Sequence, residues 1–191
     1  LRGRSKSASI GLVPILKGRH DIDANYDLLE AYLDRPFERN YDTWVALRND
    51  DDLVNRWGIH RNEYVCLQPG AANGAATPKT WHPQNFIELS RELIENCGLT
   101  IVLLGDRGDQ ECIISKYGWP ESVINTAAET SIEDLGSLIA NAACVVAHDS
   151  GIMHLANAMQ TSLVALYGPT DFEATRPMGK KTKILFSRTP A

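Results

Sequence analysis

The sequence predicts an α/β protein with a parallel sheet, and three observations support this prediction. From Tyr64 to the end of the chain, short apolar runs alternate with helical patterns, which is typical of right-handed crossovers between parallel strands. The apolar runs are continuous rather than alternating, as expected when helices cover both faces of a sheet. The loops that follow these runs are polar and rich in glycine. We therefore expect a Rossmann-like three-layer domain over residues 63–191.

The first sixty residues have a different pattern. Apolar residues recur at helical spacing from Asp21 to Asp34, which predicts one amphipathic helix that ends before Pro36. The acidic run at residues 50–52 precedes Leu53 and indicates the first turn of a second helix. Residues 1–62 are therefore interpreted as an interdomain linker segment.

Six strands and four further helices are expected after this segment. The strands are Tyr64–Leu67, Leu99–Leu104, Ser122–Asn125, Cys144–Ala147, Leu163–Tyr167 and Lys183–Phe186. The helices are Asn85–Asn96, Gly108–Tyr117, Ile132–Asn141 and Gly151–Met159. In a parallel sheet all strand-to-helix loops lie at the carboxyl edge, where helix N-termini bind ligands. The chemistry is therefore expected in these loops.

Composition excludes several classes of protein. The 191 residues carry 19 Lys+Arg against 24 Asp+Glu, a net charge of −5, which argues against a dedicated nucleic-acid binder. No run approaches the roughly 18 to 20 consecutive apolar residues of a membrane-spanning helix. The four cysteines form no C-x-x-C pair, so we expect reduced, buried thiols in a cytosolic chain. They are Cys66, Cys97, Cys112 and Cys144.

The loop at residues 69–81 consists mostly of small residues and contains Lys79. Small side chains let the backbone approach a phosphate, and a lysine can neutralise it. The loop is not a P-loop, because Pro78 stands where that motif needs glycine, and the sequence has no G-x-G-x-x-G. A surface loop without a ligand is the alternative.

The loop after the fourth strand carries the sharpest signal. Asp149 can cap a helix there, and Ser150 and Gly151 supply free N–H groups at its positive end. Ser150 and His154 share a face of that helix at positions i and i+4. The alternatives are a plain capping aspartate and a core histidine. The sequence lacks the G-x-S-x-G of a hydrolase elbow and the His-Glu-x-x-His of a zinc site, so no metal is expected.

Five motifs in order resemble glycosyltransferase family 9, the lipopolysaccharide heptosyltransferases, over about residues 64–178. They are Pro69-Gly70-Ala71 with Lys79-Thr80-Trp81-His82-Pro83, Ile101-Val102-Leu103-Leu104-Gly105, Ser131-Ile132-Glu133-Asp134-Leu135, Asp149-Ser150-Gly151-Ile152-Met153-His154-Leu155-Ala156, and Tyr167-Gly168-Pro169-Thr170-Asp171. The resemblance implies one half of a two-Rossmann-domain (GT-B type) enzyme. In that reading residues 1–62 are the remnant of the first domain.

The resemblance also implies roles for individual residues. Lys79, Asp149 and His154 match catalytic positions near the diphosphate of a nucleotide sugar. The acidic residue that holds a ribose hydroxyl is matched by Asp109 or Glu111. The positions expected to bind the nucleotide sugar are Gly70, Thr80, Asp109, Thr130, Ser150, Gly151 and Gly168.

The expected function is transfer of a sugar from an ADP-sugar donor to a lipopolysaccharide core acceptor, with inversion and with neither cofactor nor metal. The chain would be the donor-binding half, and a missing amino-terminal domain would supply the acceptor pocket and the base. A cytoplasmic location is expected, and a lipid-linked acceptor is compatible with peripheral contact with the inner membrane. The alternatives are a non-catalytic nucleotide-binding or nucleotide-sugar-binding module and a purely structural interaction domain.

Overall fold

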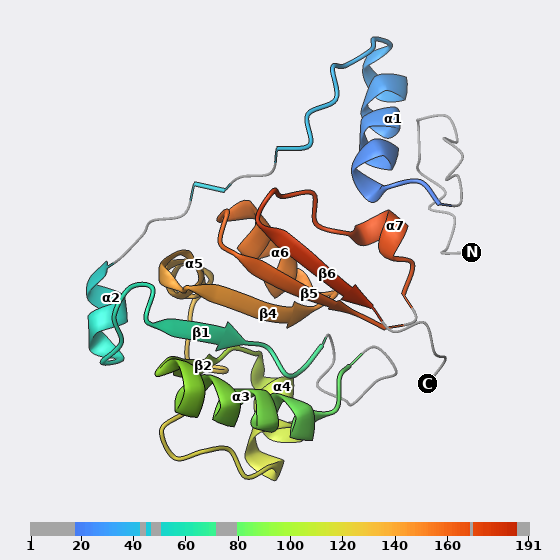
Figure 1. The fold of residues 1–191 in the computed structure, drawn as a ribbon. Coiled ribbons are helices and arrows are strands. Elements are labelled where there is room, and N and C mark those ends of the chain that lie inside the picture. Colours follow the sequence, from blue (N-terminus) through green and yellow to red (C-terminus); the bar gives the residue numbers. More distant parts are fainter. Residues whose placement is uncertain (1–17, 43–44, 47–50, 72–79, 169, 187–191) are drawn as a thin grey trace. The chain divides into compact units, whose positions relative to one another are not determined.

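The computed structural model describes residues 18–42, 45–46, 51–71, 80–168 and 170–186 (Figure 1). The chain divides into two compact units. The smaller contains residues 1–41 and 171–176, and the larger contains residues 42–170 and 177–191. Among the described residues, only the larger unit contains strands, so it holds the predicted sheet.

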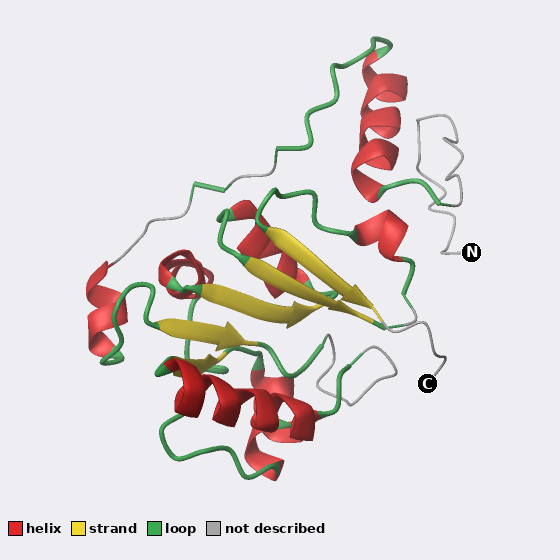
Figure 2. Cartoon of the chain, in the orientation of Figure 1, coloured by secondary structure: helices red, strands yellow, loops and turns green. Residues whose placement is uncertain are grey.

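The larger unit is built on a six-stranded, fully parallel sheet, drawn as yellow arrows in Figure 2. The strand order is β3-β2-β1-β4-β5-β6, which is the Rossmann-type order. All six predicted strands are confirmed. They are β1 (Tyr64–Leu67), β2 (Thr100–Leu103), β3 (Ile124–Asn125), β4 (Cys144–His148), β5 (Leu163–Tyr167) and β6 (Thr182–Phe186).

The helices of the larger unit are α2 (Asp51–Arg56), α3 (Pro83–Cys97), α4 (Arg107–Cys112), the 3-10 helix η1 (Ile114–Lys116), α5 (Ile132–Asn141) and α6 (Gly151–Ala158). The bounds of α3, α5 and α6 lie close to the predicted ones. The helix predicted over residues 108–117 is wrong as a single element, because Ile113 leaves helical geometry at φ −125°. Neighbours in an α-helix point about 100° apart, and the break lets both Ile113 and Ile114 be buried.

Helices cover both faces of the sheet, which confirms the three layers (Figure 1). On one face, Val65 and Leu67 of β1 and Phe86 of α3 belong to a single buried cluster. On the other face, the Tyr64 hydroxyl donates to the Leu138 carbonyl of α5 at 2.5 Å. Successive strand residues point to opposite faces, so continuous apolar runs fill both interfaces.

The cysteines are free, but the expectation that they are all buried is wrong. Cys66 lies inside β1, where burial raises the pKa of its thiol, and Cys144 is half-buried. Cys97 and Cys112 are the last residues of α3 and α4, and both are exposed there. Their positions at helix ends place them outside the apolar helix faces that pack on the sheet.

The smaller unit contains α1 (Asp21–Leu33), as predicted, and α7 (Phe172–Thr175), which is too short to produce a periodic signal. His20 caps α1: its Nδ1 accepts from the Ile22 amide at 3.1 Å, and its Nε2 lies 2.9 Å from the Arg176 carbonyl. The histidine therefore joins the start of α1 to the segment that follows α7.

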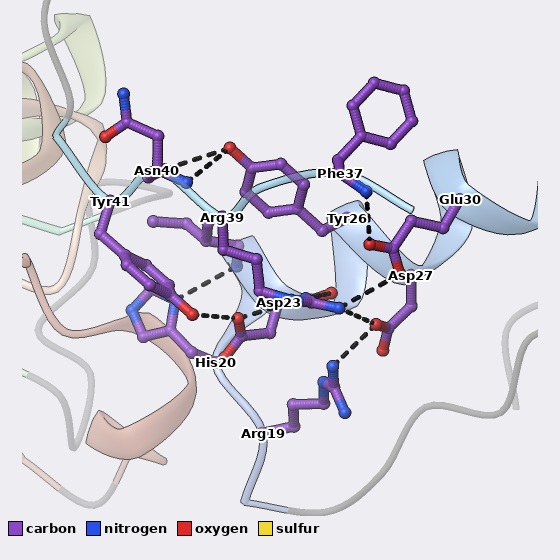
Figure 3. Close-up of polar contacts among 11 residues, drawn as sticks. Arg19, His20, Asp23, Tyr26, Asp27, Glu30, Phe37, Arg39, Asn40 and Tyr41 are labelled. Atoms are coloured by element: carbon purple, nitrogen blue, oxygen red, sulfur yellow. Dashed lines mark hydrogen bonds and ion pairs between the residues drawn. The ribbon is translucent and has the colours of Figure 1, made fainter. Parts of the chain in front are cut away.

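A cluster of charged side chains organises this unit (Figure 3). Arg39 pairs with Asp27 at 2.8 Å, with Glu30 at 3.2 Å and with Asp23 at 3.3 Å. The Tyr41 hydroxyl donates to Asp23 at 2.7 Å. That hydrogen bond is the main reason why the pKa of Asp23 is lowered.

None of the described helices combines the length and the apolar character that crossing a membrane requires.

Candidate functional site

The central strands β1 and β4 define the place where a ligand is expected. The two strands are paired, and the chain runs from β1 to α3 on one face of the sheet and from β4 to α6 on the other. Sheets of this order bind ligands beyond the carboxyl ends of the strands at which the connections diverge. The described ends of the two loops singled out from the sequence therefore lie at this edge of the sheet.

A hydrogen bond joins the two loops directly. The Ser150 hydroxyl donates to the side-chain oxygen of Gln68, the residue after β1, at 2.6 Å. The Ser150 oxygen also accepts from the Met153 amide at 3.4 Å, so Ser150 is the N-cap of α6. The prediction that Asp149 caps this helix is wrong, because Asp149 lies one residue before the cap. The start of α6 is thus anchored to the end of β1.

His148, the last residue of β4, joins three parts of this edge. It is 1% exposed. Its Nδ1 lies 2.9 Å from the Gly70 carbonyl, and its Nε2 accepts from the Trp81 amide at 2.7 Å. Burial lowers the pKa of His148. The ring also packs edge-on against Phe86, with ring centroids 5.3 Å apart. A neutral imidazole therefore connects the two described ends of the loop between β1 and α3.

Asp109 occupies the space beside Gly70. Its carboxylate completes a capping box with Asp106 at the start of α4, accepting from the Asp106 amide at 3.2 Å. A Cβ on Gly70 would lie 1.8 Å from Asp109 Oδ1, and one on Gly105 would lie 2.7 Å from Asp109 Cβ. Only glycine permits this close packing. Asp109 is 3% exposed, its Oδ1 has no hydrogen-bond partner among the described residues, and burial raises its pKa to about 6.

The structure brings several of the predicted site residues together at one edge. Gly70 contacts both His148 and Asp109, and Ser150 contacts Gln68. The prediction that Ser150 and His154 stand at positions i and i+4 of one helix is confirmed, since the His154 amide donates to the Ser150 carbonyl at 3.3 Å. The assigned roles of these residues stay predictions.

The remaining predicted residues lie in the neighbouring loops. Thr130 precedes Ser131, the N-cap of α5, and Gly168 follows β5. Glu111, the alternative to Asp109, is exposed on α4, whereas Asp109 faces the site. Lys79 lies outside the described residues. The other predicted residues are Thr80, which is half-buried at the start of the described segment 80–168, Asp149, which is half-buried, and Gly151, which is exposed.

Sequence reasoning missed the two polar residues that organise the site, Gln68 and His148. Both are almost completely buried, at 4% and 1% exposure. The available signal was a polar residue at the carboxyl end of each central apolar run. Buried polar groups need hydrogen-bond partners, so these positions marked where the two loops meet.

Within the described part of the chain, no three His, Cys, Asp or Glu residues form a group that could hold a metal ion.

The strand order and the joined loops define an α/β domain of the Rossmann-like class. The chain belongs to glycosyltransferase family 9 (heptosyltransferase), whose sequence model matches residues 12–191. Lipopolysaccharide heptosyltransferase 2 of Salmonella typhimurium is 37% identical over 122 residues, which are 61% of this chain and 34% of that protein. Lipopolysaccharide heptosyltransferase 3 of Escherichia coli K12 is 26% identical over 181 residues, which are 90% of this chain and 50% of that protein.

A solved structure extends the likeness to three dimensions. The E. coli ADP-heptose lps heptosyltransferase II matches with a TM-score of 0.72 and 26% identity, covering 90% of this chain and 56% of that one. The fold prediction of a GT-B type half is thereby confirmed. The chain spans about a third to a half of the length of the curated relatives it matches.

Proposed function

We propose that this chain is the donor-binding half of a glycosyltransferase that moves a sugar from an ADP-sugar to a lipopolysaccharide core acceptor. Membership of glycosyltransferase family 9 supports this proposal. So do the names of the relatives, which are lipopolysaccharide heptosyltransferases, and the ADP-heptose in the name of the similar E. coli enzyme. We assign donor binding to residues 63–191 and a connecting role to residues 1–62.

The observation that carries the proposal is the junction of Gln68 with Ser150. This 2.6 Å hydrogen bond sets the loop after β1 against the N-terminus of α6 at the carboxyl edge of the sheet. Free backbone N–H groups and the helix dipole favour a negatively charged group at such a terminus. Gly151, the first residue of α6, is exposed, and a Cβ there would meet no atom within 4 Å, so a ligand can approach the backbone closely. These features support the proposal that the diphosphate of a nucleotide binds here.

Each predicted residue takes a role in this proposal. Lys79, Asp149 and His154 act at the diphosphate and the departing group. Asp109 is oriented toward Gly70 rather than toward solvent, and we assign it to the ribose side of the donor. The residues proposed to line the donor are Gly70, Thr80, Asp109, Thr130, Ser150, Gly151 and Gly168.

The chemistry follows from the charge that develops when the glycosidic bond breaks. Negative charge builds up on the departing ADP, and prepositioned donors lower the barrier by stabilising it. Lys79 and the N–H groups at Ser150 and Gly151 are suited to that task. The proposal includes no metal and no cofactor. Deprotonation of the acceptor hydroxyl needs a general base, which we assign to the amino-terminal domain of the family.

We further propose a cytoplasmic location, with peripheral contact at the inner face of the membrane when the acceptor is lipid-linked. The proposed partners are the nucleotide sugar, the lipopolysaccharide acceptor and the amino-terminal domain. Nucleic acid is not among them, because the net charge of the chain is −5.

Calorimetric titration of the purified chain with ADP, UDP and GDP tests the donor assignment. We expect ADP to bind selectively, and Lys79→Ala and Asp149→Ala each to weaken binding. Lys116→Ala is the matched control, because Lys116 is an exposed lysine at the end of η1 and takes no part in the proposed site. A folded chain that binds no nucleotide, or binds all three equally, contradicts the proposal.

A non-catalytic module that senses ADP or a nucleotide sugar is the second candidate. It is favoured by the fact that every residue assigned here lies on the donor side of the proposed reaction. The two candidates differ when the amino-terminal domain of a related heptosyltransferase is supplied. Restored sugar transfer supports the enzyme, and ADP binding without any transfer supports the module.

A further inference from the structure

We propose that His148 is a positioning residue of the donor site, which holds both ends of the loop between β1 and α3 against the start of α6. This inference rests on the donor-binding function proposed above. His148 is not assigned to contact the donor itself. Its role is exerted through Gly70 and Trp81, the residues that its imidazole binds.

The hydrogen bonds define one state of the ring. The Trp81 backbone N–H can only donate, so Nε2 of His148 must be the acceptor of the 2.7 Å hydrogen bond. The Gly70 carbonyl can only accept, so Nδ1 must carry the proton at 2.9 Å. Both bonds form together only in the neutral imidazole protonated on Nδ1. Each ring nitrogen therefore has a defined role in one of these two hydrogen bonds.

Packing fixes the orientation of the ring. Phe86 of α3 is fully buried and lies edge-on to His148, with centroids 5.3 Å apart and ring planes inclined by 72°. The Trp81 indole packs edge-on against the same Phe86 at 5.1 Å. Because His148 is 1% exposed, water has little access to either of its hydrogen bonds. The ring is therefore a rigid link between the β4 strand and the loop.

The location of this link gives it a role in binding. His148 stands two residues before Ser150, the N-cap of α6, so the same short segment carries both the link and the proposed diphosphate site. The loop follows β1, which ends at Leu67, and leads into α3, which begins at Pro83, so Gly70 and Trp81 lie near its two ends. Fixing both ends of a loop reduces the entropy that ligand binding would otherwise have to overcome. Removal of the link should therefore weaken the donor site without removing any donor contact.

Three substitutions separate the two hydrogen bonds. His148→Phe keeps a ring against Phe86 but removes both bonds. His148→Gln places an amide oxygen near the position of Nε2 and so keeps an acceptor for the Trp81 amide. His148→Asn places an amide nitrogen near Nδ1 and keeps a donor for the Gly70 carbonyl. Tyr64→Phe is the matched control, because it removes a buried hydrogen bond at the opposite end of β1.

The experiment measures two quantities on the 191-residue chain: the ADP affinity by calorimetry, and the exchange rate of the Trp81 backbone amide by NMR. We expect His148→Phe to weaken ADP binding by about tenfold or more. The exchange rate of the Trp81 backbone amide should rise by at least the same factor. His148→Gln should restore Trp81 protection and part of the affinity, and His148→Asn should restore part of the affinity only. Tyr64→Phe should bind ADP as tightly as the unchanged chain. If it does, a general loss of stability does not account for the weaker binding of His148→Phe.

The outcomes distinguish this inference from the proposed function. If the unchanged chain does not bind ADP, the proposed function fails, and with it the donor-site role of His148. If the unchanged chain binds ADP and a folded His148→Phe variant binds within about twofold of it, only the inference fails. Should His148→Phe not fold, the Gln and Asn variants decide, because unchanged affinity in both overturns the inference.

Discussion

Asp109 offers the sharpest test of the electrostatics at this site. Its carboxyl group is 3% exposed, has one unpartnered oxygen among the described residues, and has its pKa raised from 3.8 to about 6, mainly by burial. The raised pKa means that folding favours the protonated form. The contribution of Asp109 to stability is therefore most favourable below pH 4 and is lost as the pH rises through about 6. Replacement by asparagine removes this dependence, because an amide does not ionise.

The size of the effect follows from the shift. A shift of about two pKa units corresponds to about 3 kcal/mol of lost stability when the pH is well above 6. Between about pH 4.5 and pH 7.5 the free energy of unfolding of the unchanged chain should fall by about 2 kcal/mol relative to that of Asp109→Asn. The test compares how the difference in free energy of unfolding between the two chains changes with pH. Any pH-independent cost of the amide, such as a buried N–H group without a partner, therefore cancels.

Urea unfolding of both chains across that pH range measures the effect. Asp134→Asn is the matched control, because Asp134 has the same N3 position in the capping box of α5 but is only half-buried. This control reports the cost of replacing an aspartate by asparagine at the same position of a capping box. If the advantage of Asp109→Asn stays constant from low to high pH, burial does not control this carboxyl group and the reasoning is wrong.

Three further predictions concern single contacts. Gly70→Ala should lower stability by about 1–3 kcal/mol in thermal unfolding, because the new Cβ would lie 1.8 Å from a buried carboxylate oxygen; Gly118→Ala, with no atom within 4 Å, is the control, and equal losses would contradict the argument. Ser131→Ala should cost about 1 kcal/mol in guanidinium unfolding, since it removes the capping box of α5; an unchanged midpoint would show that this cap contributes nothing. Tyr41→Phe should raise the pKa of Asp23 in an NMR titration, because it removes the hydrogen bond that chiefly lowers that pKa; an unchanged pKa would assign the lowering to the arginines instead.

Much of the larger unit could be predicted from local patterns. The strands Tyr64–Leu67 and Leu163–Tyr167 and the helix Ile132–Asn141 have the predicted bounds. Their apolar runs and capping residues are contained within the segments themselves, so no distant contact was needed to find them. The helix over residues 108–117 was wrong because the burial of two consecutive isoleucines depends on the core they face.

The candidate site was predictable only in outline. The loops after β1 and β4 were located because parallel strands place them at one edge. Asp149 was taken as the cap, whereas the structure uses Ser150. Both residues are good N-caps, so the local sequence left the choice between them open. The hydrogen bond between Ser150 and Gln68 joins residues 82 positions apart and has no local signal.

The sequence by itself determined the class of fold, the order of its elements and the edge of the sheet where chemistry is expected, because periodicity and chain direction are local properties. Only the tertiary structure decided how that edge is held together. His148 connects to Gly70 and Trp81, and Asp109 fits against Gly70, through contacts between segments far apart in the chain. Such contacts depend on which polar groups are buried together, and burial is a property of the folded molecule rather than of any single segment.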